Sequence, residues 1–142
     1  MVSTLQQTAQ AQLHQAKQHY QAAKYQQAFY QLERAHLLGQ RYLWLHLQTH
    51  WWMLKCGARQ QGSAEVRGQL LRLLAVLPAY LLGWVPLGNT GGANVPALRP
   101  MPIPAEFRPL FPRYPVLRDM ALRLVLGLSL VGVSLVFAPV FG

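Results

Sequence analysis

The chain has little cysteine and few acidic residues. Its 142 residues include one cysteine, Cys56, and four acidic side chains, Glu33, Glu65, Glu106 and Asp119. A single cysteine excludes an intramolecular disulfide framework, a zinc ribbon and a CxxC redox motif. Four acids leave few candidates for an enzyme built on paired carboxylates. The sequence also lacks a P-loop, a GxGxxG segment, a GxSxG elbow and an HExxH motif, so no motif marks a catalytic residue.

Charge is scarce as well, and it is mostly of one sign. Charged residues make up 12% of the chain and hydrophobic residues 52%, a balance that excludes intrinsic disorder. The net charge of +9 would suit a nucleic acid, but the basic residues are scattered singly and are not interleaved with aromatic side chains. We therefore expect no nucleic-acid binding. An anionic membrane surface explains scattered positive charge equally well.

Apolar side chains recur at helical spacing through the first half of the chain, which predicts an all-α protein. Residues 5–21 are predicted to form a polar helix that packs weakly. Residues 23–38 and 41–58 each carry one continuous apolar stripe. The connection between these two helices is so short that they must form an antiparallel αα-hairpin. Gly39 is expected to cap the first of them in a left-handed conformation.

A segment rich in proline and glycine follows the helices. A fourth helix is predicted to begin near Ala64, and Pro78 should kink or end it. Residues 86–104 then contain three glycines and five prolines, which excludes a regular helix or a central strand. The apolar side chains in this segment favour an extended arm packed on the helices over a flexible linker.

The C-terminal residues predict a membrane anchor. No charged residue occurs from Leu124 to Gly142, and a helix of this length spans the roughly 30 Å of a bilayer core. Arginines just before it predict attachment to the cytoplasmic face of the inner membrane. The alternative is a core helix of a cytoplasmic protein. We expect a helical domain over residues 1–85, the arm over 86–118 and the apolar helix over 119–142.

Glu33, His36, His46 and His50 form a candidate metal site. Glu33 and His36 are three residues apart, and His46 and His50 are four apart, so each pair shares one helical face. In the antiparallel hairpin the two pairs lie at matched heights. Helical side chains lean toward their own N-terminus, so all four should converge within about one helical turn. Three imidazoles and one carboxylate suit divalent zinc, iron, cobalt, nickel or copper.

Structural roles are also open to these residues. His36 could be a core histidine that donates to a backbone carbonyl, and Glu33 could pair with a neighbouring arginine. His46 and His50 could lie at a membrane or partner surface. The chain lacks the second Glu-x-x-His of a di-iron site, which a symmetric homodimer would supply.

Three segments resemble a bacterial family, domain of unknown function 3703: LERAHLLGQ, HLQTHWWMLK and RGQLLRLLAVLPAYLLGWVPLGNTGGANVPALRPMPIP. The resemblance covers roughly residues 20–104, and GNTGGANV followed by RPMPIP is its most specific part. It implies a compact helical protein with an ordered Pro/Gly arm and brings no established activity. Its loose association with bacterial metal resistance favours a metal at the matching positions, Glu33, His36, His46 and His50.

We therefore expect a small helical protein that binds a transition metal and serves metal homeostasis or resistance. The alternative is a non-catalytic, membrane-associated protein–protein interaction module whose partner the sequence does not identify. An enzyme is the least favoured class. Ligation by neutral imidazoles predicts that metal affinity falls as the pH drops through about 6.5.

Overall fold

The computed structural model describes residues 4–60, 62–111 and 115–137, with side-chain burial given as far as Ser129. Within these residues the chain is helical and contains no strand, which confirms the all-α prediction. The elements are α1 (Thr4–Gln21), α2 (Tyr25–Gly39), α3 (Leu43–Arg59), α4 (Ser63–Leu82), the short 3₁₀ helix η1 (Ala105–Leu110) and α5 (Val116–Phe137).

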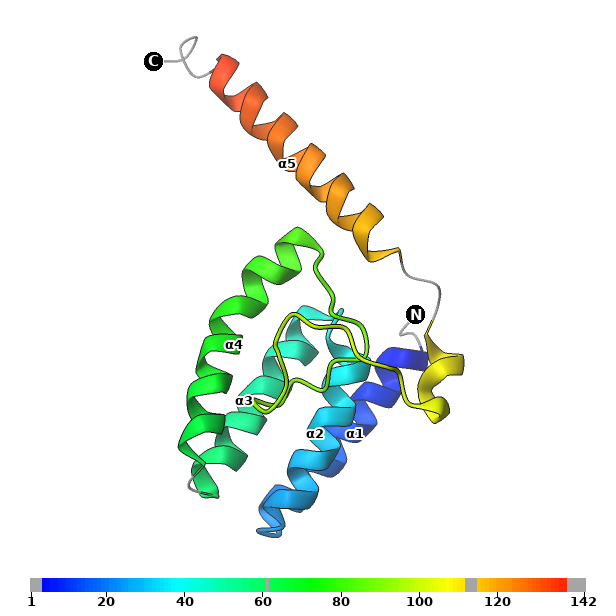
Figure 1. Ribbon diagram of the computed structural model, residues 1–142, viewed down its shortest axis with the longest axis vertical. Helices are drawn as coiled ribbons and strands as arrows, with labels where there is room; N and C mark the ends of the chain where they lie inside the picture. The colour runs from blue at the N-terminus through cyan, green and yellow to red at the C-terminus, as the bar shows by residue number, and fades with distance from the viewer. Residues whose placement is uncertain (1–3, 61, 112–114, 138–142) are drawn as a thin grey trace.

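The first four helices pack in chain order, α1 on α2, α2 on α3 and α3 on α4 (Figure 1). Turns of a few residues join them, so each helix runs antiparallel to the next. The predicted hairpin is the α2–α3 pair. Its core includes Leu32 of α2 and Met53 of α3, which are 1% and 0% exposed. This pairing brings the faces that carry the candidate histidines together.

The prediction that the first helix packs weakly is wrong. α1 lies along α2, and its apolar stripe is buried, with Leu5, Ala9, Leu13 and Ala16 each exposing 4% or less of their surface. The stripe is narrow and half of it is alanine. Because alanine has almost no side chain, the helix axes approach closely and a narrow stripe is enough to close the core.

Gly39 does not cap α2 in a left-handed conformation. It is the last helical residue, and the C-cap, Gln40, has an ordinary φ of −59°. A Cβ atom at Gly39 would lie 3.2 Å from the Cβ of Leu45 and 3.5 Å from the Cβ of Ala9. Glycine is used here because α1, α2 and α3 meet at this point, rather than for its conformational freedom.

Helix α4 continues through Pro78 to Leu82, so the proline does not end the helix, which was one of the two outcomes expected. Pro78 and Leu74 are exposed, so water can reach the Leu74 carbonyl that a proline cannot pair. The helix ends instead at Gly83, whose φ is +73°. That conformation favours glycine and turns the chain back over the bundle.

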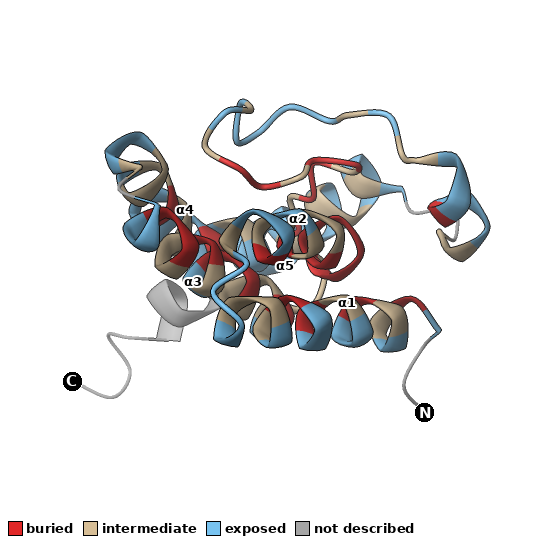
Figure 2. Cartoon of the chain, turned by 90° about the horizontal axis from the view of Figure 1, so that it is seen from below, coloured by how far each residue is buried: buried red, intermediate tan, exposed pale blue. Residues whose placement is uncertain are grey.

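The Pro/Gly-rich arm lies across the helices (Figure 1). Figure 2 shows a buried stretch in this otherwise exposed segment. The Asn89 side chain, 1% exposed, holds the arm together. Its Nδ2 donates to the carbonyls of Pro96 and Arg99 at 2.8 Å, and its Oδ1 accepts from the Gly91 amide at 2.9 Å.

Helix α5 extends away from the bundle (Figure 1) and touches α4 near its own start. The Arg123 guanidinium donates to the Tyr80 carbonyl at 2.7 Å and pairs with Asp119 at 3.0 Å. In the part of the chain whose placement is described, no helix is long and apolar enough to cross a membrane. This finding does not support the predicted anchor. Residues 138–142 of that span, and the side chains beyond Ser129, lie outside the described residues.

Candidate metal centre

His36 of α2 and His46 and His50 of α3 converge on one point. The Nε2 atom of His46 lies 2.9 Å from Nε2 of His36 and 3.0 Å from Nε2 of His50. One ring nitrogen from each residue falls within 4.8 Å of the others. We refer to these three residues as the histidine cluster. The hairpin places them as the sequence predicted, because residues 46 and 50 share the α3 face that packs on α2.

The cluster is covered from outside by α4 and the arm. His36 and His50 are each 2% exposed, and His46 is half-buried. Gly91 of the arm lies against the ring of His36, so closely that a Cβ atom there would be 2.7 Å from its Cγ. Gly91 also has a φ of +81°, so both its conformation and its lack of a side chain are needed for this contact.

The second ring nitrogens of two histidines are held by oxygen acceptors. Nδ1 of His36 donates to the backbone carbonyl of Asn89 at 3.0 Å, and Nδ1 of His50 donates to Oε1 of Gln69 at 2.6 Å. A carbonyl oxygen only accepts, so both Nδ1 atoms carry the proton. In the neutral rings the Nε2 atoms therefore bear lone pairs that point into the cluster.

The orientation of the Gln69 amide follows from its other contacts. Its Nε2 donates to Oε1 of Glu65 at 2.6 Å and to the Gly91 carbonyl at 2.8 Å. The amide oxygen is thereby left to face His50. Gln69 is fully buried, so one side chain of α4 ties α3, α4 and the arm together and sets which nitrogen of His50 is free.

Burial keeps the cluster uncharged at neutral pH. Desolvation is the largest cause lowering the pKa of each ring, to well below the usual value for His36, to about 3 for His46 and to about 4 for His50. The neighbouring imidazoles lower the pKa of His36 and His46 further, and the Arg72 guanidinium lowers that of His50. Protons therefore compete for the folded site only well below the pH of about 6.5 expected from the sequence.

Two charged residues of α4 fix the arm over the cluster. Glu65 accepts from the Ala93 amide at 3.0 and 3.2 Å. Arg72 donates to the carbonyls of Gly92 at 2.9 Å and Val95 at 2.6 Å. An extended segment has no helix or sheet to pair its backbone N–H and C=O groups. The side chains of Glu65 and Arg72 supply hydrogen bonds that these groups would otherwise make with water.

Glu33 is not part of this group. Its carboxylate lies at the arm instead, where it takes a hydrogen bond from the Thr90 side chain, and burial raises its pKa. A Cβ atom on Gly92 would lie 3.3 Å from its Oε1. Glu33 is on the same face of α2 as His36, but the group of potential metal ligands does not include it. Its role as a metal ligand stays a prediction.

Sequence reasoning missed the residues that orient the cluster. Gln69 and Asn89 supply the acceptors, and Glu65 and Arg72 hold the arm. Glu65, Gln69 and Arg72 are spaced by four and three residues, so helical periodicity places them on one face of α4. Nothing local indicates that this face meets the histidines of α3. Cys56 is buried, and burial raises its thiol pKa to about 11.

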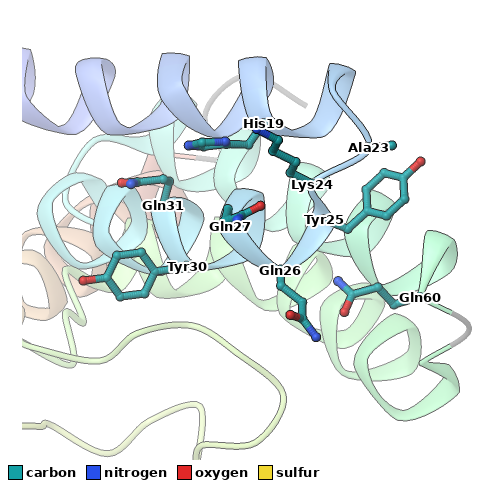
Figure 3. A pocket seen from close by; sticks show the side chains of 9 residues that line it. All are labelled: His19, Ala23, Lys24, Tyr25, Gln26, Gln27, Tyr30, Gln31 and Gln60. Atoms are coloured by element: carbon teal, nitrogen blue, oxygen red, sulfur yellow. The ribbon is translucent and has the colours of Figure 1, made fainter.

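A hollow of about 530 Å³ lies away from the histidine cluster, at the turn between α1 and α2 (Figure 3). Its side chains are mainly glutamine and tyrosine, with His19 and Lys24. No carboxylate lines it, and a single imidazole does not hold a metal. This hollow therefore does not offer a second metal site.

The fold and the cluster define a small all-α protein with a buried three-histidine centre under a Pro/Gly-rich arm. The model of a family described as "Protein of unknown function (DUF3703)" matches residues 3–111, and the chain belongs to this family. The match contains α1–α4, the arm as far as Phe111 and η1, including every residue of the centre. Comparison with curated proteins and with solved structures found no match.

Proposed function

We propose that this protein binds a divalent transition metal through Nε2 of His36, His46 and His50. The observation that carries the proposal is the convergence of three Nε2 atoms, two of which are fixed as lone-pair donors by acceptors at Nδ1. Histidine ligands in metal proteins almost always donate their other ring nitrogen to a carbonyl or carboxylate in this way.

A purely structural role explains the cluster less well. His36 does donate to a backbone carbonyl, as a core histidine would, but that leaves its Nε2 facing two other rings. If His46 carries its proton on Nε2, that one proton cannot form two full hydrogen bonds. At least one short nitrogen–nitrogen contact then sets lone pair against lone pair in a buried site. A cation at the centre turns both contacts into ligand pairs.

The donor set limits the choice of metal. Three neutral imidazoles suit zinc, cobalt, nickel and copper, whereas iron usually has a carboxylate ligand as well. Around zinc at about 2.0–2.1 Å, tetrahedral nitrogens are roughly 3.4 Å apart. The contacts of 2.9 and 3.0 Å need to open by only a few tenths of an ångström. A buried, preformed site of this kind supports a role in metal homeostasis or resistance, as a buffer or carrier.

Elemental analysis of the full chain, purified without an affinity tag or chelator, tests the proposal. We expect close to one metal ion per chain, and its loss in His46→Ala. His14→Ala is the matched control, because His14 is exposed on α1 and outside the cluster. Zinc at a hundredfold excess over its Kd should stabilise the metal-free protein by about 2.7 kcal/mol.

Melting curves of the same proteins with zinc, cobalt, nickel, copper or chelator complete the test. The proposal is wrong if the purified chain holds no metal and none of the four ions raises its melting temperature. It is also wrong if His46→Ala binds metal as tightly as the control.

The second candidate is a helical interaction module, and one observation favours it. The outer side of α4 exposes large apolar side chains, among them Leu71 at 68% and Leu74 at 76%. Exposed apolar surface of this kind often marks an interaction site. A module without a metal predicts melting that is indifferent to both chelator and added ions, so the same experiment separates the two candidates.

A further inference from the structure

A small cavity adjoins the face of the histidine cluster. It has a volume of about 50 Å³ and is lined by all three imidazoles. This volume holds one or two molecules of the size of water. The rest of its wall is mostly small and apolar, including Ala75, Val76 and Ala79 of α4 and Ala97 of the arm. A molecule in this cavity is in reach of a metal bound by the three histidines.

The protein supplies three ligand atoms and no fourth in the described part of the chain. The group of potential ligands contains neither a carboxylate nor a thiolate. A divalent ion held by three neutral rings keeps its full charge of about +2 in a buried site. The Arg72 guanidinium, which also lines the cavity, adds to the positive potential there. The Glu65 carboxylate is linked to the cluster through the Gln69 amide, which hydrogen-bonds to both Glu65 and His50. It therefore does not neutralise the ion by direct contact.

Trp84 provides a hydrogen-bond donor that has no partner. Its side chain lines this cavity and a neighbouring one beside His46. The indole Nε1 is buried and, among the described residues, finds no acceptor. An indole nitrogen only donates, and a buried donor without a partner is costly. An anion or water in the cavity is the acceptor that this position lacks.

We infer that the metal centre is open, and that its fourth position takes a small exogenous monoanion of one to three heavy atoms from the cavity. The inference rests on the proposed function, because it needs a metal on His36, His46 and His50. Hydroxide derived from water is the smallest such ligand, and azide is a probe of the same charge that fits the size. Trp84 donates to the bound anion.

Cobalt makes the fourth position visible. The full chain is freed of metal and loaded with Co²⁺, whose visible absorption depends on the number and kind of its ligands, and is then titrated with sodium azide in chloride-free buffer. We expect a saturable change in the spectrum. Trp84→Phe, which keeps an aromatic ring but removes the N–H, should bind Co²⁺ normally and azide about tenfold more weakly.

A cavity-filling variant locates the ligand. Ala79→Leu should still bind Co²⁺ through the three histidines but should lose the response to azide. Ala64→Leu is its matched control, because Ala64 is exposed on the same helix and far along it from the cavity. Melting of each variant with cobalt shows whether it is folded. Trp84→Phe keeps the inference testable if Ala79→Leu does not fold.

The possible failures are distinct. If the wild-type chain gives no cobalt spectrum and none of the four ions raises its melting temperature, both the proposed function and the open position are wrong. A cobalt spectrum that azide leaves unchanged overturns the open position alone. An azide response that survives in both Ala79→Leu and Trp84→Phe places the anion outside this cavity and overturns the inference.

Discussion

The contact between the arm and the histidine cluster can be tested at Gly91. An alanine here would place its Cβ 2.7 Å from Cγ and Cδ2 and 2.8 Å from Nδ1 of His36, where carbon atoms normally keep about 3.5 Å or more. The His36 ring is 2% exposed, and its two nitrogens contact the Asn89 carbonyl and His46, so it cannot move without losing these contacts. Gly91→Ala therefore has to displace either the ring or the arm.

The cost follows from three contributions. A φ of +81° in an L-residue other than glycine costs about 1–2 kcal/mol. Displacing the His36 ring loses its hydrogen bond to the Asn89 carbonyl, worth about 1 kcal/mol. Lost packing adds a similar amount, so we expect destabilisation of about 3 kcal/mol and a melting temperature lower by roughly 10 °C. Metal affinity should fall by about tenfold or more, because His36 is a proposed ligand.

Urea unfolding with chelator and titration with zinc measure the two effects separately. Gly92→Ala is the matched control. Its Cβ would meet the Oδ1 of Asn94 at 2.5 Å, but Asn94 is exposed and its side chain can rotate away. We expect the control to lose less than about 1 kcal/mol. If Gly91→Ala matches it in both stability and zinc affinity, the arm does not press on His36 and our account of the site's assembly is refuted.

Three further predictions concern the surroundings of the cluster. Gln69→Leu removes the acceptor of His50 Nδ1 and should weaken zinc binding about 10–100-fold in a calorimetric titration; unchanged affinity would show that this hydrogen bond does not orient the ring. Glu33→Gln should leave the metal content by elemental analysis unchanged, because the carboxylate lies beside Thr90, and loss of the metal would make Glu33 a ligand after all. In the metal-free protein the cluster's pKa values lie below the unfolded value of about 6.5, so unfolding takes up protons and stability falls as the pH drops below 6.5. Each histidine contributes about 1.4 kcal/mol of this loss between pH 7.5 and 5.5, about 4 kcal/mol in all, and equal urea midpoints at the two pH values would contradict it.

Much of the fold follows from local patterns in the sequence. Apolar spacing of three and four residues identifies each helix, and a connection of a few residues forces its neighbours to be antiparallel. From the hairpin and the lean of helical side chains toward the N-terminus, Glu33, His36, His46 and His50 were all expected to converge. The three histidines do so, and Glu33 is not in their group. The error at Gly39 arose because the packing of three helices, rather than the conformation of the backbone, requires glycine there.

The sequence by itself determined the helices, the hairpin and the three converging imidazoles, because each depends on residues a few positions apart. The tertiary structure decided which ring nitrogens are free, why Glu33 stands apart, and that a cavity adjoins the centre. Those features depend on contacts between distant residues, such as His36 with the Asn89 carbonyl and His50 with Gln69, which are 53 and 19 positions apart. Such contacts exist only once the arm has folded back over the helices, and no local periodicity encodes its path.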